Sequence, residues 1–290
     1  MTHPPLPWKG AGLGLRRELI APLREGLPAG LDFVEVAPEN WAGEGGAQAR
    51  FLQALSEQVP VVAHGLCLNL GGFAPLDMNL VADVKALMKR LRMPFYSEHL
   101  AWTADEGNLY DLMPLPFNAE AVRHVAGRIR QVQDALERRI GIENVSYYVG
   151  SPLDDMSEAE FLQAVLADAD CALHLDVNNV YVNSVNHGFD AHAYIAALPS
   201  DRLAYIHIAG HLKESDDLLI DTHGADVIDP VWGLLDHTYA YHGVRPTLLE
   251  RDFNIPPLTT LMREVRQIGR TQARHAITTR TAEARHVAIA

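Results

Sequence analysis

The chain has 290 residues, 48% of them hydrophobic and 21% charged, and its 24 basic and 37 acidic side chains give a net charge of −13 with neutral histidine. These values are typical of a globular protein with a large core and exclude a disordered, collagen-like or coiled-coil chain. The acidic balance also argues against nucleic acid or an anionic membrane as the main partner, because phosphate binding needs a basic surface.

Apolar, β-rich segments alternate with segments of helical period along nearly the whole chain. The glycine-rich run Gly10–Arg16 follows no predicted strand, so we interpret it as a turn into the first helix and not as a phosphate-binding loop. The predicted strands are Leu31–Ala37, Val59–Leu68, Pro94–Trp102, Ile140–Tyr148, Cys171–Asn179, Leu203–His211, Leu218–His223 and Arg245–Phe253.

Several of the intervening helices carry recognisable start signals. Apolar residues repeat every three or four positions within Asn118–Arg139, and Asn118 is the expected N-cap. Ser157, with Glu160 three residues later, forms a capping-box pattern for the next helix. Further helices are predicted near Asp77–Leu91, Asp190–Leu198 and Pro257–Ile268.

Eight strands, each followed by a helix or a long loop, predict a single (β/α)₈ TIM barrel in a chain slightly longer than the ~250 residues typical of that fold. An open doubly wound sheet is the alternative, and the strand count favours the barrel. We expect residues 1–270 to form one metal-binding catalytic domain. Residues 271–290 lose apolar periodicity and are predicted to be a C-terminal tail.

Targeting and redox features are few. No run approaches the roughly 18 apolar residues of a membrane span, and residues 1–10 lack a signal-peptide pattern, so we expect a cytoplasmic protein. With only Cys67 and Cys171, a disulfide framework and a Cys-x-x-Cys metal site are excluded. The chain's 14 histidines remain to be explained.

Nearly every predicted strand carries a metal-competent side chain toward its C-terminal end, where barrel active sites form. Asp221 and His223, two apart on one predicted strand, are expected to face the same way. Asn179 follows Asp176 at +3 and is expected at the same mouth. The full set is His64, His99, Glu143, Asp176, His207, Asp221, His223 and Glu250.

Carboxylates forced into one cavity repel each other unless cations neutralise them, so this set predicts two or three divalent ions. Imidazole and carboxylate ligands without thiolate suit Fe, Mn or Zn, and ligand type alone does not choose among them. A single His or Asp in a strand is more often structural than a ligand. The other histidines, including the deeper His174, are therefore interpreted as structural or solvated.

Weaker candidates lie beside this set. Glu39, Asn40 and Trp41 follow the first predicted strand at the end where a substrate would bind, although Trp41 could also cap the barrel. His211 is a candidate substrate or supporting group.

Taken together, these motifs resemble the multinuclear non-haem iron-dependent oxidative enzymes (MNIO). This bacterial family is also catalogued as domain of unknown function 692 and uncharacterised protein family 0276, and one member helps make the copper-binding peptide methanobactin. The resemblance rests on Gly12–Arg16, Glu39–Trp41, Ser97–Leu100, Gly141–Asn144, Leu175–Asn179, His207–His211, Asp221–Gly224 and Leu249–Asp252. It implies a barrel of the xylose-isomerase type with two or three iron ions at its mouth.

The ligand order also resembles that of endonuclease IV, a three-zinc barrel that cuts DNA at abasic sites. Two features count against that function. Asn179 stands where that family has a histidine, and the charge of −13 does not suit a protein that grips duplex DNA.

By analogy with both families, His64, His99 and Glu143 would hold one metal. Glu143 would bridge to a second held by Asp176, His207 and Glu250, with a third near Asp221, His223 and Asn179. The MNIO resemblance implies a mixed Fe(II)/Fe(III) pair that uses dioxygen to oxidise a cysteine of a ribosomally made precursor peptide. It also implies a small partner protein, encoded nearby, that presents the peptide. In these roles Glu143, Asp176, His207 and Glu250 would be the catalytic set.

Two other functions remain open. A metal-dependent hydrolase or isomerase of the endonuclease IV or xylose-isomerase type would act on a phosphorylated or sugar substrate through a metal-activated hydroxide, with Zn or Mn as the metal. A non-catalytic barrel would serve as a scaffold for recognition alone.

Overall fold

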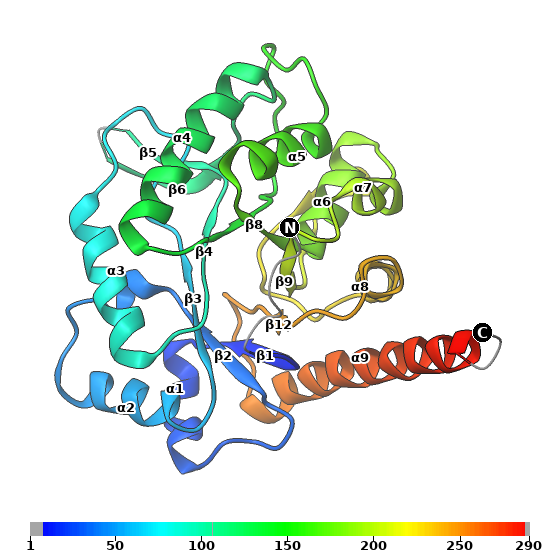
Figure 1. The fold of residues 1–290 in the computed structure, drawn as a ribbon. Coiled ribbons are helices and arrows are strands. Elements are labelled where there is room, and N and C mark those ends of the chain that lie inside the picture. The colour runs from blue at the N-terminus through cyan, green and yellow to red at the C-terminus, as the bar shows by residue number, and fades with distance from the viewer. Residues whose placement is uncertain (1–7, 106, 288–290) are drawn as a thin grey trace.

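Eight parallel strands close into a barrel surrounded by helices (Figure 1). The computed structural model describes residues 8–105 and 107–287. In spatial order the barrel strands are β1 (Ala11–Gly14), β12 (Thr247–Leu249), β9 (Leu203–Ile208), β8 (Ala172–Asp176), β7 (Gly141–Glu143), β4 (Tyr96–His99), β3 (Val61–Gly65) and β2 (Phe33–Val36). The predicted TIM barrel is therefore confirmed.

The helices pack outside the strands and bury one apolar face each. They are α1 (Arg17–Glu25), α2 (Gly46–Ser56), α3 (Met78–Leu91), α4 (Ala119–Leu136), α5 (Glu158–Ala169), α6 (Val177–His187), α7 (Ala191–Ala197), α8 (Asp229–His242) and α9 (Leu258–Val287), with a 3₁₀ turn η1 (Pro38–Asn40) after β2. The predicted caps are confirmed, because the Asn118 side chain accepts hydrogen bonds at the start of α4 and Ser157 and Glu160 form the capping box of α5. None of the helices in the described part of the chain is long and apolar enough to cross a bilayer.

The predicted number of eight barrel strands is correct, but one barrel strand was not predicted and one predicted strand lies outside the barrel. The run Gly10–Arg16, predicted to be a turn, contains the barrel strand β1, which pairs with β2 and β12. The strand was not recognised because glycine is rare in strands. Here glycine is required, because an added Cβ at Gly12 would lie 2.4 Å from Cε2 of Phe33 on β2.

The predicted barrel strand Leu218–His223 does not form. Only Leu219–Ile220 is extended (β11), and it pairs with β10 (Leu212–Lys213) in a hairpin outside the barrel. Asp221 and His223 lie in the loop that follows, where His223 adopts a left-handed backbone with φ of 48°. A second hairpin, β5 (Trp102–Ala104) and β6 (Asn108–Met113), follows β4.

The predicted strand Cys171–Asn179 also ends earlier than expected. Strand β8 stops at Asp176, and α6 begins at the next residue with the Asp176 side chain accepting from the backbone N–H of Asn179 at 2.7 Å. Asn179 therefore lies in the first turn of a helix.

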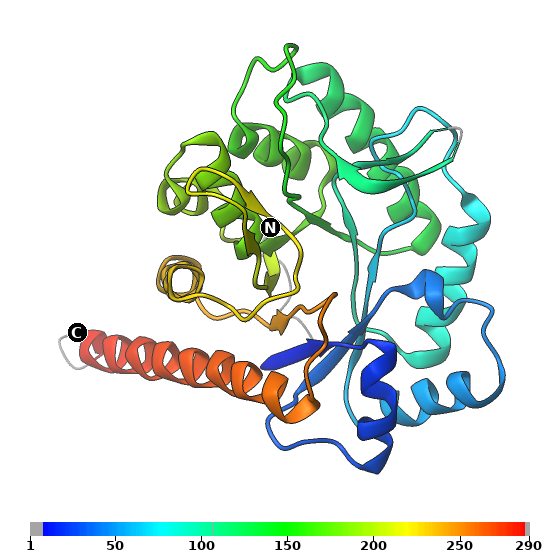
Figure 2. The ribbon, with the colours of Figure 1, turned by 180° about the vertical axis from the view of Figure 1, so that it is seen from behind.

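The C-terminal segment differs from the expected tail. Helix α9 continues without a break to Val287, and its far part points away from the ring of helices in both views (Figures 1 and 2). Thr271 and Gln272 are buried, and the Gln272 amide donates to the backbone oxygens of Gly10 and Arg245 at 3.0 Å each. The first turn of the expected tail is therefore packed against the barrel.

The barrel interior has two distinct layers. The lower one is an apolar cluster in which Trp8 packs against Phe33, Phe95 and Tyr205 with ring centroids 5.1–6.5 Å apart. Because side chains alternate between the two faces of a strand, the inward residues two positions further along point into the barrel above this cluster. There Phe33 gives way to Glu35 and Tyr205 to His207, so a polar layer lies directly on an apolar floor.

Candidate metal centre

The polar layer gathers ionisable side chains from seven of the eight strands or the residues just after them. All but His99, which is partly buried, are buried. They are Glu35 on β2, His64 on β3, His99 on β4, Glu143 on β7, His174 and Asp176 on β8, His207 on β9, and Glu250 directly after β12.

The first expected ligand set comes together around one oxygen of Glu143. Its Oε2 lies 2.9 Å from Nε2 of His64 and 3.1 Å from Nε2 of His99, and the two Nε2 atoms are 3.2 Å apart. The Nδ1 of His99 lies 2.8 Å from the backbone oxygen of Gly65, which only accepts, so Nδ1 carries the proton. Nε2 of His99 is then left with a free lone pair for a cation.

The second expected set comes together around the other oxygen of Glu143. Its Oε1 lies 3.1 Å from Nδ1 of His207, which is 2.9 Å from Oε2 of Glu250. Ligand atoms of Glu143, Asp176, His207 and Glu250 all lie within 4.8 Å of one another. The two oxygens of Glu143 thus face different groups, which is the geometry of a bridging carboxylate.

Glu35 was missed by the sequence analysis. Its Oε2 accepts hydrogen bonds from Nε2 of His207 at 3.0 Å and from the hydroxyl of Tyr205 at 2.9 Å. By accepting this hydrogen bond it keeps the proton of a neutral His207 ring on Nε2, which leaves Nδ1 unprotonated and facing Glu143 and Glu250. Carboxylates in this position commonly orient metal-binding histidines.

The third expected set is only partly assembled. His223 Nε2 lies 2.7 Å from Oδ1 of Asp221, and its Nδ1 lies 3.0 Å from Oδ2 of Asp252, a residue that was not predicted. Arg16 forms ion pairs with both Asp252 and Glu250. The Asn179 amide donates to the backbone oxygen of Asn144 at 3.0 Å, while its own oxygen is buried.

Unpartnered polar atoms test whether this centre fits metal ions. Among the described residues, four buried ligand-type atoms of the expected sets make no hydrogen bond, although buried polar atoms nearly always do. They are Oδ2 of Asp176, Oδ1 of Asn179, Nδ1 of His207 and Nε2 of His223, and the two imidazole nitrogens face carboxylate oxygens at 2.9 and 2.7 Å instead. Imidazole nitrogens and carboxyl or amide oxygens without thiolate suit Fe, Mn or Zn, so the residues fit a divalent cation.

The charges in this layer depend strongly on one another. Burial alone would raise the pKa of Glu143, but the facing imidazoles of His174, His64, His99 and His207 hold it well below its usual range. Burial and the nearby charge of Glu143 raise the pKa of Asp176 to about 7. A carboxylate close to protonation at neutral pH is what crowding without a cation produces.

A cavity of about 1000 Å³ opens above the metal-competent residues. His64, His99, His223 and Glu250 reach it from below, and Asn40 and Trp41 line its wall as expected. Exposed apolar side chains form part of its rim: Leu66, Met113 at the end of β6, Tyr148, Val149 and Phe253.

Two expected substrate residues have other contacts. Glu39 is absent from the cavity wall, and its Oε1 accepts from the backbone N–H groups of Leu66 and Cys67 at 2.8 and 3.0 Å. His211 is also absent from the wall. Its Nδ1 lies 2.7 Å from Oδ1 of Asn178, whose amide donates to Oδ1 of Asp221 at 2.8 Å, so it reaches the site only indirectly.

Residues 10–273 match the family model described as "RiPP precursor modification enzyme MbnB/TglH/ChrH", where RiPP denotes a ribosomally made, post-translationally modified peptide. The chain belongs to this family, the MNIO family. A UPF0276 protein of Nitrosospira multiformis is 60% identical over 265 residues, covering 91% of this chain and 94% of the relative. A UPF0276 protein of Pseudomonas aeruginosa is 58% identical, covering 91% and 93%. The predicted family is therefore confirmed.

Several solved structures of sugar epimerases share this fold. The apo 3-keto-D-glucoside 4-epimerase YcjR of Escherichia coli superposes with a TM-score of 0.59 at 13% identity, covering 91% of this chain and 99% of the epimerase. A D-psicose 3-epimerase of Clostridium cellulolyticum gives 0.58 at 13% identity, covering 92% and 94%. At this identity the likeness establishes the xylose-isomerase-like barrel and carries no information on substrate.

Proposed function

We propose that this protein is a multinuclear non-haem iron enzyme that uses dioxygen to oxidise a cysteine of a ribosomally made precursor peptide. The observation that carries the proposal is the cluster of buried, unpartnered ligand atoms beneath an open cavity, in a chain of a peptide-modifying family. Such a cluster is costly to bury without cations and accessible to a substrate from above.

Two ligand sets share Glu143 in this proposal. His64, His99 and one oxygen of Glu143 would hold one ion. The other oxygen, with Asp176, His207 and Glu250, would hold a second, and Asp221, His223 and Asn179 would hold a third. When bound, iron supplies dioxygen activation and a binding position for the substrate thiolate.

The protein's own groups bind, orient and exclude water. Glu143 connects the two ligand sets, because one oxygen faces Nε2 of His64 and the other faces Nδ1 of His207. Glu35 keeps Nδ1 of His207 free of a proton. Trp41, Tyr147 and Trp102 line the cavity and would shield the reacting cysteine from water, while the apolar rim would contact the flanking peptide.

A peptide substrate also explains the openness of the site. A cavity of about 1000 Å³ with exposed Val149 and Phe253 at its edge is larger than a single amino acid needs. We propose that a small partner protein encoded nearby presents the peptide, since a second, linked contact raises the effective concentration of the peptide at the site.

The test uses protein purified without oxygen and a cysteine-containing peptide encoded beside its gene, with the adjacent small protein present. We expect about two or three irons per chain and, once dioxygen is admitted, a mass change located at a peptide cysteine. No mass change under these conditions would contradict the proposal.

The alternatives give different outcomes in the same assay. Turnover of a sugar or phosphorylated compound that persists without dioxygen, with Zn or Mn as the resident metal, would identify a hydrolase or isomerase. A biological effect that survives His207→Ala and Glu250→Ala would identify a scaffold.

A further inference from the structure

A fully buried serine connects two histidines beneath the centre. The hydroxyl of Ser97 on β4 lies 2.9 Å from Nδ1 of His64 and 3.1 Å from Nδ1 of His174. Among the described residues these two rings are its hydrogen-bond partners. All three groups are at most 6% exposed.

The single proton of that hydroxyl makes the two rings dependent on each other. If Nε2 of His64 binds a metal, this neutral ring carries its proton on Nδ1 and donates it to Ser97 Oγ. The hydroxyl hydrogen must then point at the other ring, so Nδ1 of His174 accepts it. A hydroxyl that instead accepted from both rings would leave its own buried hydrogen without a partner.

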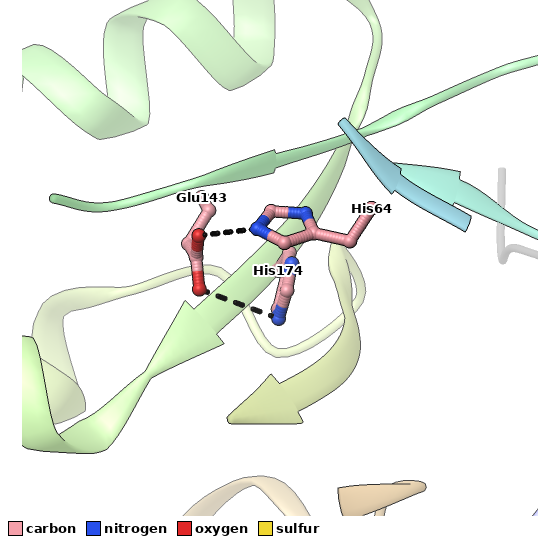
Figure 3. A group of neighbouring side chains, drawn as sticks. All are labelled: His64, Glu143 and His174. Atoms are coloured by element: carbon pink, nitrogen blue, oxygen red, sulfur yellow. Dashed lines mark ion pairs between the residues drawn. The ribbon is translucent and has the colours of Figure 1, made fainter. Parts of the chain in front are cut away.

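The remaining proton of His174 is thereby placed on Nε2. That atom lies 3.5 Å from Oε1 of Glu143, whereas Nε2 of His64 faces the other oxygen, Oε2 (Figure 3). Two ring contacts fix the plane of His174: it stacks on Tyr205 with centroids 4.5 Å apart and meets His207 edge-on at 4.0 Å.

We infer that His174 is a positioning residue whose Nε2–H points at the bridging carboxylate, and that Ser97 excludes it from the metal ligands by setting its tautomer. Distance alone suggests otherwise, because His174 shares a cluster with His64 and Glu143 that has the spacing of a metal site. The placement of protons distinguishes His174 from His64. Because the Ser97 hydroxyl can accept from one ring and must donate to the other, only one of the two rings can have an unprotonated Nε2. His64 has the second imidazole, His99, beside it and is the ligand.

The donor has a defined physical role. A donor at Nε2, 3.5 Å from Oε1, would attract the Glu143 carboxylate and hold it in the plane in which Oε2 faces His64 and His99. The inference rests on the proposed function only in requiring that His64 binds a metal ion.

Metal binding by matched variants tests it. In His174→Gln the amide nitrogen can occupy the Nε2 position as a donor, whereas His174→Leu removes the donor at similar size; His64→Gln serves as the ligand control. In anaerobic titrations with Fe²⁺ alone we expect His174→Gln to keep the stoichiometry of the parent protein. His174→Leu should raise the Kd about 10- to 100-fold, the usual effect of losing a supporting contact. His64→Gln should lose one ion. Loss of an ion in His174→Gln would overturn the inference.

A spectroscopic measurement on the parent protein gives the tautomer directly. In Zn²⁺-loaded protein labelled with ¹⁵N-histidine, NMR should find His174 protonated on Nε2 and unprotonated on Nδ1. In Ser97→Ala this preference should weaken to a mixture of tautomers.

The outcomes separate the two proposals. A metal-bound Nε2 at His174 in the parent protein would overturn the positioning role and leave the metal centre standing. Failure of the parent protein to bind Fe²⁺ would overturn the proposed function itself.

Discussion

Single residues acquire their roles in this protein from the alternation of side chains along barrel strands. On β9, Tyr205 belongs to the apolar floor, and His207, two positions later, belongs to the polar layer. The same step separates Phe33 from Glu35 on β2. A one-residue shift of any strand would exchange ligands for core residues, so the register that packs the floor also assembles the site.

Glu143 is the residue on which both ligand sets depend. Glu143→Gln keeps the shape but replaces a charged oxygen by an amide, so we expect loss of at least one bound iron and of peptide oxidation, with the fold retained. Metal analysis of anaerobically purified protein measures the iron content, and circular dichroism measures whether the fold is retained. Glu158→Gln is the matched control: Glu158 is a carboxylate held by Tyr194 away from the cavity, and its variant should keep its full metal content. Full metal occupancy in Glu143→Gln would disprove the bridging role.

The site residues differ in how visible they are in the sequence. His64, His99, Glu143, Asp176, His207 and Glu250 follow β-rich runs, and the structure brings them together. Glu35 is hidden inside an ordinary strand, and it meets His207 across 172 residues only because the barrel closes. Arg16 and Asp252 belong to motifs of the family resemblance but were given no role, because their contact forms only where the first and last barrel strands of the chain pair.

At the scale of elements, β1 shows how packing overrides propensity. Its four residues, Ala-Gly-Leu-Gly, have little strand preference, yet they pair on both sides and complete the barrel. The strand forms because β2 and β12 supply hydrogen-bond partners and because Gly12 leaves room for the Phe33 ring.

We therefore expect Gly12→Ala to lower the free energy of unfolding by about 2 kcal/mol or more, the cost of forcing an extra methyl into a packed core. Urea denaturation of the two proteins measures it. Gly127→Ala on α4 is the control, since nothing lies within 4 Å of the added Cβ and alanine favours a helix. Equal midpoints for Gly12→Ala and the parent protein would show that β1 tolerates the side chain.

The loops at the carboxyl ends of the strands were harder to predict than the strands. Asp221 and His223 do meet, at 2.7 Å, but in a loop with a left-handed residue and not on a strand. Their contact depends on Ser146 and Asn178, which hold the Asp221 carboxylate from two other elements. The alternation of apolar and polar residues, which identifies strands, does not predict the conformation of such a loop.

At the scale of the whole molecule, the metal centre makes stability depend on pH. Burial lowers the pKa of His64, but the charge of Glu143 outweighs this and raises it to about 9 in the metal-free protein. A histidine whose pKa is raised on folding stabilises the fold below its unfolded value of about 6.5, and this contribution is lost as pH rises toward 9. Asp176, with its pKa raised to about 7, acts in the same direction but at lower pH, because its stabilising contribution is lost as pH rises from its unfolded pKa of about 3.9 to about 7.

Chelator-treated protein should therefore lose stability between pH 6.5 and 9, by roughly 2 kcal/mol or more. The free energy of unfolding of the metal-loaded protein should change less over this pH range, because bound cations replace the protons. Urea denaturation of both forms at the two pH values measures the difference, and a buffer-only incubation without chelator is the control. Parallel pH profiles for the loaded and chelated forms would contradict this account.

The sequence by itself determined the barrel, the family and most of the residues that meet at the candidate metal centre, because hydrophobic periodicity and the placement of His, Asp and Glu after apolar runs are local properties of the chain. Only the tertiary structure decided which strand closes the barrel, that Glu39 and His211 stand back from the cavity, and that Glu35 and His174 lie under the centre. Those outcomes depend on contacts between residues far apart in sequence, where steric fit and hydrogen-bond partners are set by the closed fold and leave no periodic signal.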